Sequence, residues 1–104
     1  METEQISMQI IAFSGNARTL AFEALEEYKS KNYEKCDELL KEAVEALNEA
    51  HKSQTSLLVA EANGQDPKCN VLLIHAQDHL MTSMLALDLI RQMIDLHRME
   101  SEDR

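Results

Sequence analysis

The segment from His75 to His79 carries the side chains best suited to chemistry in this chain of 104 residues. On a helix, His75 and His79 lie one turn apart on the same face. An imidazole with a pKa near 6.5 offers a neutral ring nitrogen at cytosolic pH, so it can accept a phosphoryl group without a separate base. Neighbouring donors such as His79, Gln77 or Thr82 would stabilise the transferred charge. The alternative, which is more usual for a single histidine, is that each ring only packs in a core or an interface.

Asp78 is the second unusual residue of this segment. With residues placed about every 100° around a helix, Asp78 falls within a row of aliphatic side chains. A buried carboxylate without a partner is unfavourable, so it should be hydrogen-bonded, protonated or bound to a cation. If the row lay on a symmetry axis, copies of Asp78 would meet there and could share a hard cation such as Mg²⁺. The alternative is a local hydrogen bond to a neighbouring side chain.

A zinc site is a competing interpretation of the same segment. His75, Asp78 and His79 resemble the H-x-x-E-H pattern of one class of zinc proteases, with Asp in place of Glu. Two histidines at this spacing can begin a zinc site, but no third ligand stands at a diagnostic spacing. A small zinc hydrolase is therefore the less favoured hypothesis. His51 and Gln54 are polar residues that could approach His75 or simply cap a helix seam, and the sequence does not decide between these roles.

Three helical segments are predicted to position these residues, over approximately 4–30, 33–62 and 70–99. The chain has two Gly, one Pro and no Trp. It is rich in residues that lose little on entering a helix, which predicts an all-α fold. In the first segment, apolar residues recur in steps of three and four: Ile6, Ile10, Phe13, Ala17, Leu20 and Ala24. The second segment carries a seam typical of coiled-coil packing, formed by Cys36, Leu40, Ala43, Leu47, Ala50, Gln54 and Leu57.

Two short breaks, Ser30–Asn32 and 63–68, separate the three segments. Asn32 is a plausible N-cap of the second helix. Short connections between helices of similar length predict antiparallel neighbours, and hence an up-down-up three-helix bundle in one domain over residues 1–104. Gly15 suggests close helix packing around it, because Gly within a helix costs about 1 kcal/mol relative to Ala; the alternative is an incidental glycine. The charged tail from Glu100 onward is expected to fray.

The third helix has more apolar surface than a three-helix monomer would cover. One stripe lies at about 240–320° from His75 around the helix, and it comprises Val71, Ile74, Met81, Leu85, Leu89 and Leu96. A second stripe lies at about 20–60°, and it comprises Leu72, Ala86 and Ile90. A helix that is apolar on two sides needs more protein around it, which favours self-association with closed rotational symmetry. The alternative is that the wide stripe lies deep in a monomer.

The charge and composition exclude several classes of function. The formal net charge is −9, which disfavours binding to nucleic acid and to anionic membrane surfaces. No apolar run approaches the roughly 20 residues that span a bilayer. The first residues lack the basic and apolar regions of a secretory signal, and Cys36 and Cys69 lack a paired spacing, so both are expected to be ordinary thiols of a cytoplasmic protein.

The chain resembles the enzyme IIA component of the lactose/cellobiose type in the bacterial phosphoenolpyruvate-dependent sugar phosphotransferase system. The most specific match is the segment 71–84, VLLIHAQDHLMTSM. Two further segments agree in order along the chain: SGNAR at 14–18, and LNEAH at 47–51 followed by Gln54 and Thr55. The resemblance covers nearly the whole chain, with no departure inside the central motif and no sign of a fused domain. It predicts a single, stand-alone IIA domain of this type.

The resemblance also implies an assembly and a set of partners. It implies a homotrimer with the third helices innermost, and one structural Mg²⁺ per trimer held by the three copies of Asp78. It implies that His75 takes a phosphoryl group from the phosphorylated carrier protein HPr and passes it to a cysteine of the cognate IIB component. His79 and Gln77 are the expected supporting residues. The pathway ends at a membrane IIC component during uptake of a β-linked disaccharide, and the sequence does not say which sugar.

Overall fold

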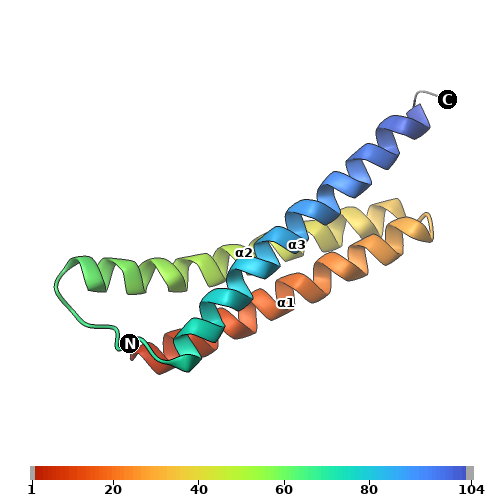
Figure 1. The fold of residues 1–104 in the computed structure, drawn as a ribbon. Helices are drawn as coiled ribbons and strands as arrows, with labels where there is room; N and C mark the ends of the chain where they lie inside the picture. Colours follow the sequence, from red (N-terminus) through yellow and green to blue (C-terminus); the bar gives the residue numbers. More distant parts are fainter. Residues whose placement is uncertain (1, 103–104) are drawn as a thin grey trace.

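The computed structural model describes residues 2–102, and these form three long helices joined by two short connections (Figure 1). The helices are α1 (Thr3–Lys29), α2 (Tyr33–Ala62) and α3 (Val71–Glu102). Helices α1 and α3 start at the same end of the rod, and α2 runs antiparallel to both (Figure 1). The bundle measures 57 × 19 × 19 Å. The predicted all-α, up-down-up arrangement is confirmed for a single chain.

The connection between α1 and α2 differs from the prediction at Asn32. Asn32 occupies the N-cap position of α2, but its side chain makes no capping hydrogen bond. Its amide Nδ2 instead donates to Oε2 of Glu27 at 2.7 Å. The turn is closed by backbone hydrogen bonds, with Lys31 in the left-handed region at φ 66°. The side chain thus ties the turn back to α1 rather than satisfying the free N–H groups of α2.

The ends of the other helices follow local chemistry. Gly64 takes a positive φ of 86° just after α2, a conformation that is unfavourable for residues with a Cβ atom. Asn70 caps α3, since its Oδ1 accepts a hydrogen bond from the backbone N–H of Leu73 at 2.9 Å. Helix α3 extends to Glu102, beyond the predicted end at about residue 99. The rest of the expected tail, residues 103–104, lies outside the described residues.

Small side chains fill the centre of the bundle. In α2 every seventh residue is buried, in agreement with the predicted seam: Cys36, Ala43, Ala50 and Leu57. In α1, the predicted core position Phe13 is 37% exposed, whereas its neighbour Ser14 is fully buried. The core face of α1 is formed by Ile6, Ser7, Ile10, Ser14, Ala17, Ala21, Ala24 and Tyr28. This run of Ala and Ser lets the helices pack closely, and larger side chains such as Ile10 and Leu80 are fully buried beside it.

Helix α3 has a buried face and an open apolar face. Its core face is formed by Leu73, Ala76, Leu80, Ser83, Leu87, Ile90 and Ile94. The first predicted stripe lies outside the bundle, with 50–82% of each side chain exposed in the single chain. We call it the open stripe: Val71, Ile74, Met81, Leu85, Leu89 and Leu96. Helix α1 contacts both of the other helices extensively, whereas α2 and α3 touch little, which leaves this side of α3 uncovered.

Long as they are, none of the helices in residues 2–102 is apolar enough to cross a membrane.

Candidate functional site

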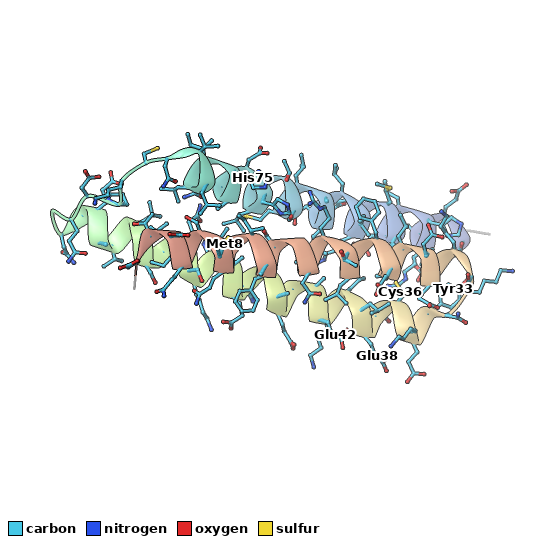
Figure 2. All side chains as sticks on the ribbon, turned by 90° about the horizontal axis from the view of Figure 1, so that it is seen from below. Met8, Tyr33, Cys36, Glu38, Glu42 and His75 are labelled. Atoms are coloured by element: carbon cyan, nitrogen blue, oxygen red, sulfur yellow. The ribbon has the colours of Figure 1, made fainter. Side chains whose placement is uncertain are left out.

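His75 and His79 form an edge-on pair near the start of α3. Figure 2 shows where His75 lies on that helix. Their ring centroids are 5.3 Å apart, and the ring planes are inclined by 72°. The side chain of His75 is exposed, while His79 is half-buried against α1. The structure therefore brings these two predicted site residues together, and only His75 is open to an incoming molecule.

Two residues of α1 hold His79 in place. Arg18 Nη2 lies 3.2 Å from Nε2 of His79, and Ser14 Oγ lies 3.4 Å from Nδ1. A guanidinium can only donate, so Nε2 must be the unprotonated acceptor, and the ring hydrogen sits on Nδ1. Nδ1–H then donates to Ser14 Oγ, whose own hydroxyl donates to the carbonyl of Ile10. The contacts define one tautomer of a neutral His79.

Gly15 lies directly beneath the same ring. A Cβ atom at this position would meet Cε1 of His79 at 3.5 Å, which is an ordinary van der Waals contact. The helices are thus no closer at Gly15 than a Cβ atom allows, which favours the alternative of an incidental glycine over the expected close packing. An alanine would fit without displacing the imidazole.

The environment of His79 keeps it neutral. Burial lowers the pKa of His79 below its ordinary value of 6.5, and the nearby positive charge of Arg18 lowers this pKa further. His75 acts in the same direction, while the carboxylate of Asp78 opposes them. These effects agree with the tautomer that the hydrogen bonds define.

Gln77 is not brought to the histidine pair within one chain. It lies about 200° around α3 from His75, on the side that faces α2. Its Oε1 accepts a hydrogen bond of 2.6 Å from Nε2 of Gln54. Gln54 therefore engages the Gln77 carbonyl oxygen and leaves the Gln77 NH₂ group without a hydrogen-bond partner among the described residues. His51, one turn before Gln54, is exposed on α2.

Asp78 lies in the open stripe between Ile74 and Met81, and it is exposed in the single chain. Within residues 2–102 its carboxylate has neither a hydrogen-bond partner nor an ion pair, so the alternative of a local side-chain hydrogen bond is not met. Thr82 donates its hydroxyl to the backbone carbonyl of Asp78 at 2.9 Å, so this expected donor is already engaged.

Metal-binding groups are sparse in one chain. No three His, Cys, Asp or Glu side chains in the described part of the chain are grouped to hold a metal ion. The zinc hypothesis therefore lacks a third ligand beside His75 and His79. A cation at Asp78 would need carboxylates from further copies of the chain. The two cysteines are free thiols, Cys36 buried and Cys69 exposed, and burial raises the pKa of Cys36.

Arg18 and Ser14 are functional candidates that the sequence did not reveal. Both belong to the SGNAR segment, whose only link to function in the sequence is its resemblance to the family. They lie four residues apart, and hence on one face of α1. That spacing was the available signal, but their contacts reach 61 and 65 residues along the chain to His79.

Known proteins with similar sequences and folds share one family. The family described as "PTS system, Lactose/Cellobiose specific IIA subunit" matches residues 5–98. The lactose-specific EIIA component of Staphylococcus epidermidis is 40% identical over 97 residues, covering 93% of each chain. The N,N'-diacetylchitobiose-specific EIIA component of Escherichia coli K12 is 44% identical over 96 residues, covering 92% of this chain and 83% of that one.

Two solved structures extend the comparison to the fold. The crystal structure of the PTS cellobiose-specific enzyme IIA from Bacillus anthracis is 43% identical, with a TM-score of 0.92 over 100% of this chain and 95% of that one. The IIA(Chitobiose) protein of Escherichia coli, solved in solution in complex with HPr, gives a TM-score of 0.81 at 40% identity, covering 97% and 98% of the two chains. With the family matched from residue 5 to residue 98, the chain belongs to the lactose/cellobiose-specific IIA family of the sugar phosphotransferase system.

Proposed function

We propose that this protein is a cytoplasmic phosphocarrier that holds a phosphoryl group on His75. The observation that carries the proposal is the exposed His75 ring beside a neutral, fixed His79 at the start of α3. An exposed imidazole can be reached in line by a donor protein, and its unprotonated nitrogen needs no base. His79 lies beside His75 but does not compete with it as a nucleophile, because Arg18 donates a hydrogen bond to the unprotonated ring nitrogen of His79.

In the transfer, a lone pair on a ring nitrogen of His75 forms a bond to phosphorus while the bond from phosphorus to the donor atom breaks. The electrons of the broken bond stay on the donor atom, and the hydrogen on the second ring nitrogen of His75 stays in place. His75 becomes a phosphorylated imidazolium, which can lose its ring proton or pass the phosphoryl group to the acceptor. Positioning and charge stabilisation supply most of the acceleration in such transfers.

HPr is the proposed donor, because a similar IIA protein has been solved in complex with HPr. The proposed acceptor is a cysteine of the cognate IIB component, which passes the group on during sugar uptake. The similar proteins are named for lactose, cellobiose and N,N'-diacetylchitobiose, so a β-linked disaccharide is the proposed cargo of the system. No pocket for that sugar is required in this chain.

Assembly as a homotrimer would complete the site. Packing three open stripes around an axis would bury their aliphatic side chains and bring three copies of Asp78 together. Carboxylate oxygens suit a hard cation, so the unpaired Asp78 fits one shared Mg²⁺ that offsets the repulsion. Gln77 flanks the stripe on the side away from His75. In a ring of three, the free NH₂ group of Gln77 would then face the His75 of the adjacent protomer.

Labelling from phosphorylated HPr tests the nucleophile. Wild-type protein should acquire an acid-labile phosphoryl group, and His75→Asn should acquire none. His51→Asn is the matched control, since it removes an exposed histidine of α2 and should label normally. Acid-labile label on His75→Asn would show that another residue is the carrier. Absence of label on the wild type would favour a non-catalytic helical adaptor.

The metal is tested by chelation. EDTA should lower the melting temperature of the wild type, and added Mg²⁺ should restore it. Asp78→Asn should melt at the same temperature with and without EDTA. A wild-type melting temperature that is indifferent to EDTA would remove Mg²⁺ from the proposal and leave the phosphocarrier role intact.

A further inference from the structure

Arg18 is the one cationic side chain that contacts either site histidine within residues 2–102. Its Nη2 lies 3.2 Å from Nε2 of His79, and the His79 and His75 ring centroids are 5.3 Å apart. Together with the radius of the imidazole, these separations place the guanidinium no more than about 10 Å from the His75 ring centre, roughly one Debye length. The flexible side chain can shorten that distance by rotation.

Most N–H donors of the Arg18 guanidinium have no hydrogen-bond partner among the described residues. The guanidinium has five N–H donors, and the His79 contact is the only side-chain hydrogen bond it makes among the described residues. No carboxylate of the described part of the chain lies within ion-pair distance of it. A half-buried arginine with free donors and no counter-ion can bind an anion that enters the site.

The phosphorylated site needs such a charge. A phosphoryl group brings about two negative charges at pH 7, into a chain whose net charge is already −9. The nearest acid along α3, Asp78, adds repulsion. We propose that Arg18 is a phosphoryl-binding residue, whose guanidinium donates to the phosphoryl oxygens on His75 and which His79 holds in readiness while the site is empty. This inference rests on the proposed function, because it presupposes a phosphoryl group on His75.

Three substitutions separate charge from packing. Arg18→Gln keeps a polar side chain with amide N–H donors but removes the charge. Arg18→Lys keeps the charge and loses the planar fork. Ser14→Ala removes the other support of His79 and leaves Arg18 in place. Arg91→Gln is the matched control, because it deletes an exposed arginine on the polar side of α3. Circular dichroism establishes that each variant is folded.

The measurement is the equilibrium between phosphorylated HPr and each protein, read as the ratio of phosphorylated to free IIA. Arg18→Gln should lower this ratio roughly tenfold or more, as expected for loss of a charge-assisted hydrogen bond. Arg18→Lys should retain part of the ratio, and Arg91→Gln should leave it near the wild-type value. Ser14→Ala, which loosens His79 but keeps the charge of Arg18, should lower the ratio much less than Arg18→Gln does. An unchanged ratio for Arg18→Gln, or an equal fall for Ser14→Ala, would reduce Arg18 to a support for His79. Wild-type protein that takes no phosphoryl group at all would instead overturn the proposed function.

Discussion

A single lysine in the open stripe should dissociate the assembly. Leu85 lies in the middle of the stripe and is 58% exposed in the single chain. In the proposed trimer its three copies would lie near the axis, out of water. At micromolar concentrations we therefore expect the wild type to be trimeric and Leu85→Lys to be monomeric.

The size of the effect follows from the exposed fraction. Full burial of a Leu side chain is worth about 1.5–3 kcal/mol. The exposed part of Leu85 would thus contribute about 1–2 kcal/mol per copy, or about 3–5 kcal/mol in a trimer. Each 1.4 kcal/mol is a factor of ten, so the association constant should fall by roughly two to four orders of magnitude. Repulsion among three ammonium groups would add to this loss.

Sedimentation velocity over a range of concentrations gives the assay. Val59→Lys is the control, because Val59 is 53% exposed but lies on α2 outside the stripe. The control should sediment as the wild type does. A trimeric Leu85→Lys protein, or a wild type that stays monomeric at high concentration, would refute the assignment of this stripe as the assembly surface.

Three further predictions concern the site and the core. The pKa of His79 is lowered from 6.5 in the folded protein, so the unfolded chain binds a proton more readily and the free energy of unfolding should fall as the pH drops through 6.5. In urea titrations at pH 7.5 and 5.5, at equal protein concentration, this free energy should fall less for His79→Gln than for the wild type. An equal fall in the two proteins would disprove this linkage. Gly15→Ala should stabilise the protein by up to about 1 kcal/mol, because Ala favours the helix more than Gly does and its Cβ has space against His79. Urea denaturation measures this change, and a lower stability of the variant would mean that the imidazole cannot accommodate the methyl group. Ser83→Ala should be neutral or stabilising by about 1 kcal/mol, because the buried Ser83 hydroxyl has no hydrogen-bond partner among the described residues. Ser14→Ala should destabilise the protein, because the Ser14 hydroxyl is hydrogen-bonded. If Ser83→Ala melted at a lower temperature than Ser14→Ala, the hydrogen-bond assignments would be contradicted.

Periodicity was sufficient for the architecture because the helices are long and uninterrupted. The heptad seam of α2 predicted a core that the structure confirms at Cys36, Ala43, Ala50 and Leu57. The pattern was less reliable in α1, where Phe13 was expected inside and its neighbour Ser14 is buried instead. Hydrophobicity favours the larger residue, but close helix packing selects the smaller one. Two neighbouring stripes on one helix cannot be separated by period alone.

The site was only partly accessible from the sequence. Spacing along one helix placed His75 beside His79, since both belong to α3. It could not place Arg18, whose partner lies 61 residues away and whose charge is typical of a solvated face. The orientation of Gln77 also depends on another helix, because Gln54 of α2 holds its amide. Contacts between helices require the register of the bundle, which no local pattern specifies.

Native mass spectrometry, with and without phosphorylated HPr, tests the central claim most directly, because it weighs the assembly and counts its phosphoryl groups in one spectrum. We predict a trimer that gains up to three phosphoryl groups, all lost after brief acid treatment, and a His75→Asn trimer that gains none. Phosphoryl groups on the His75→Asn trimer, or a wild-type spectrum unchanged by the donor, would contradict the account.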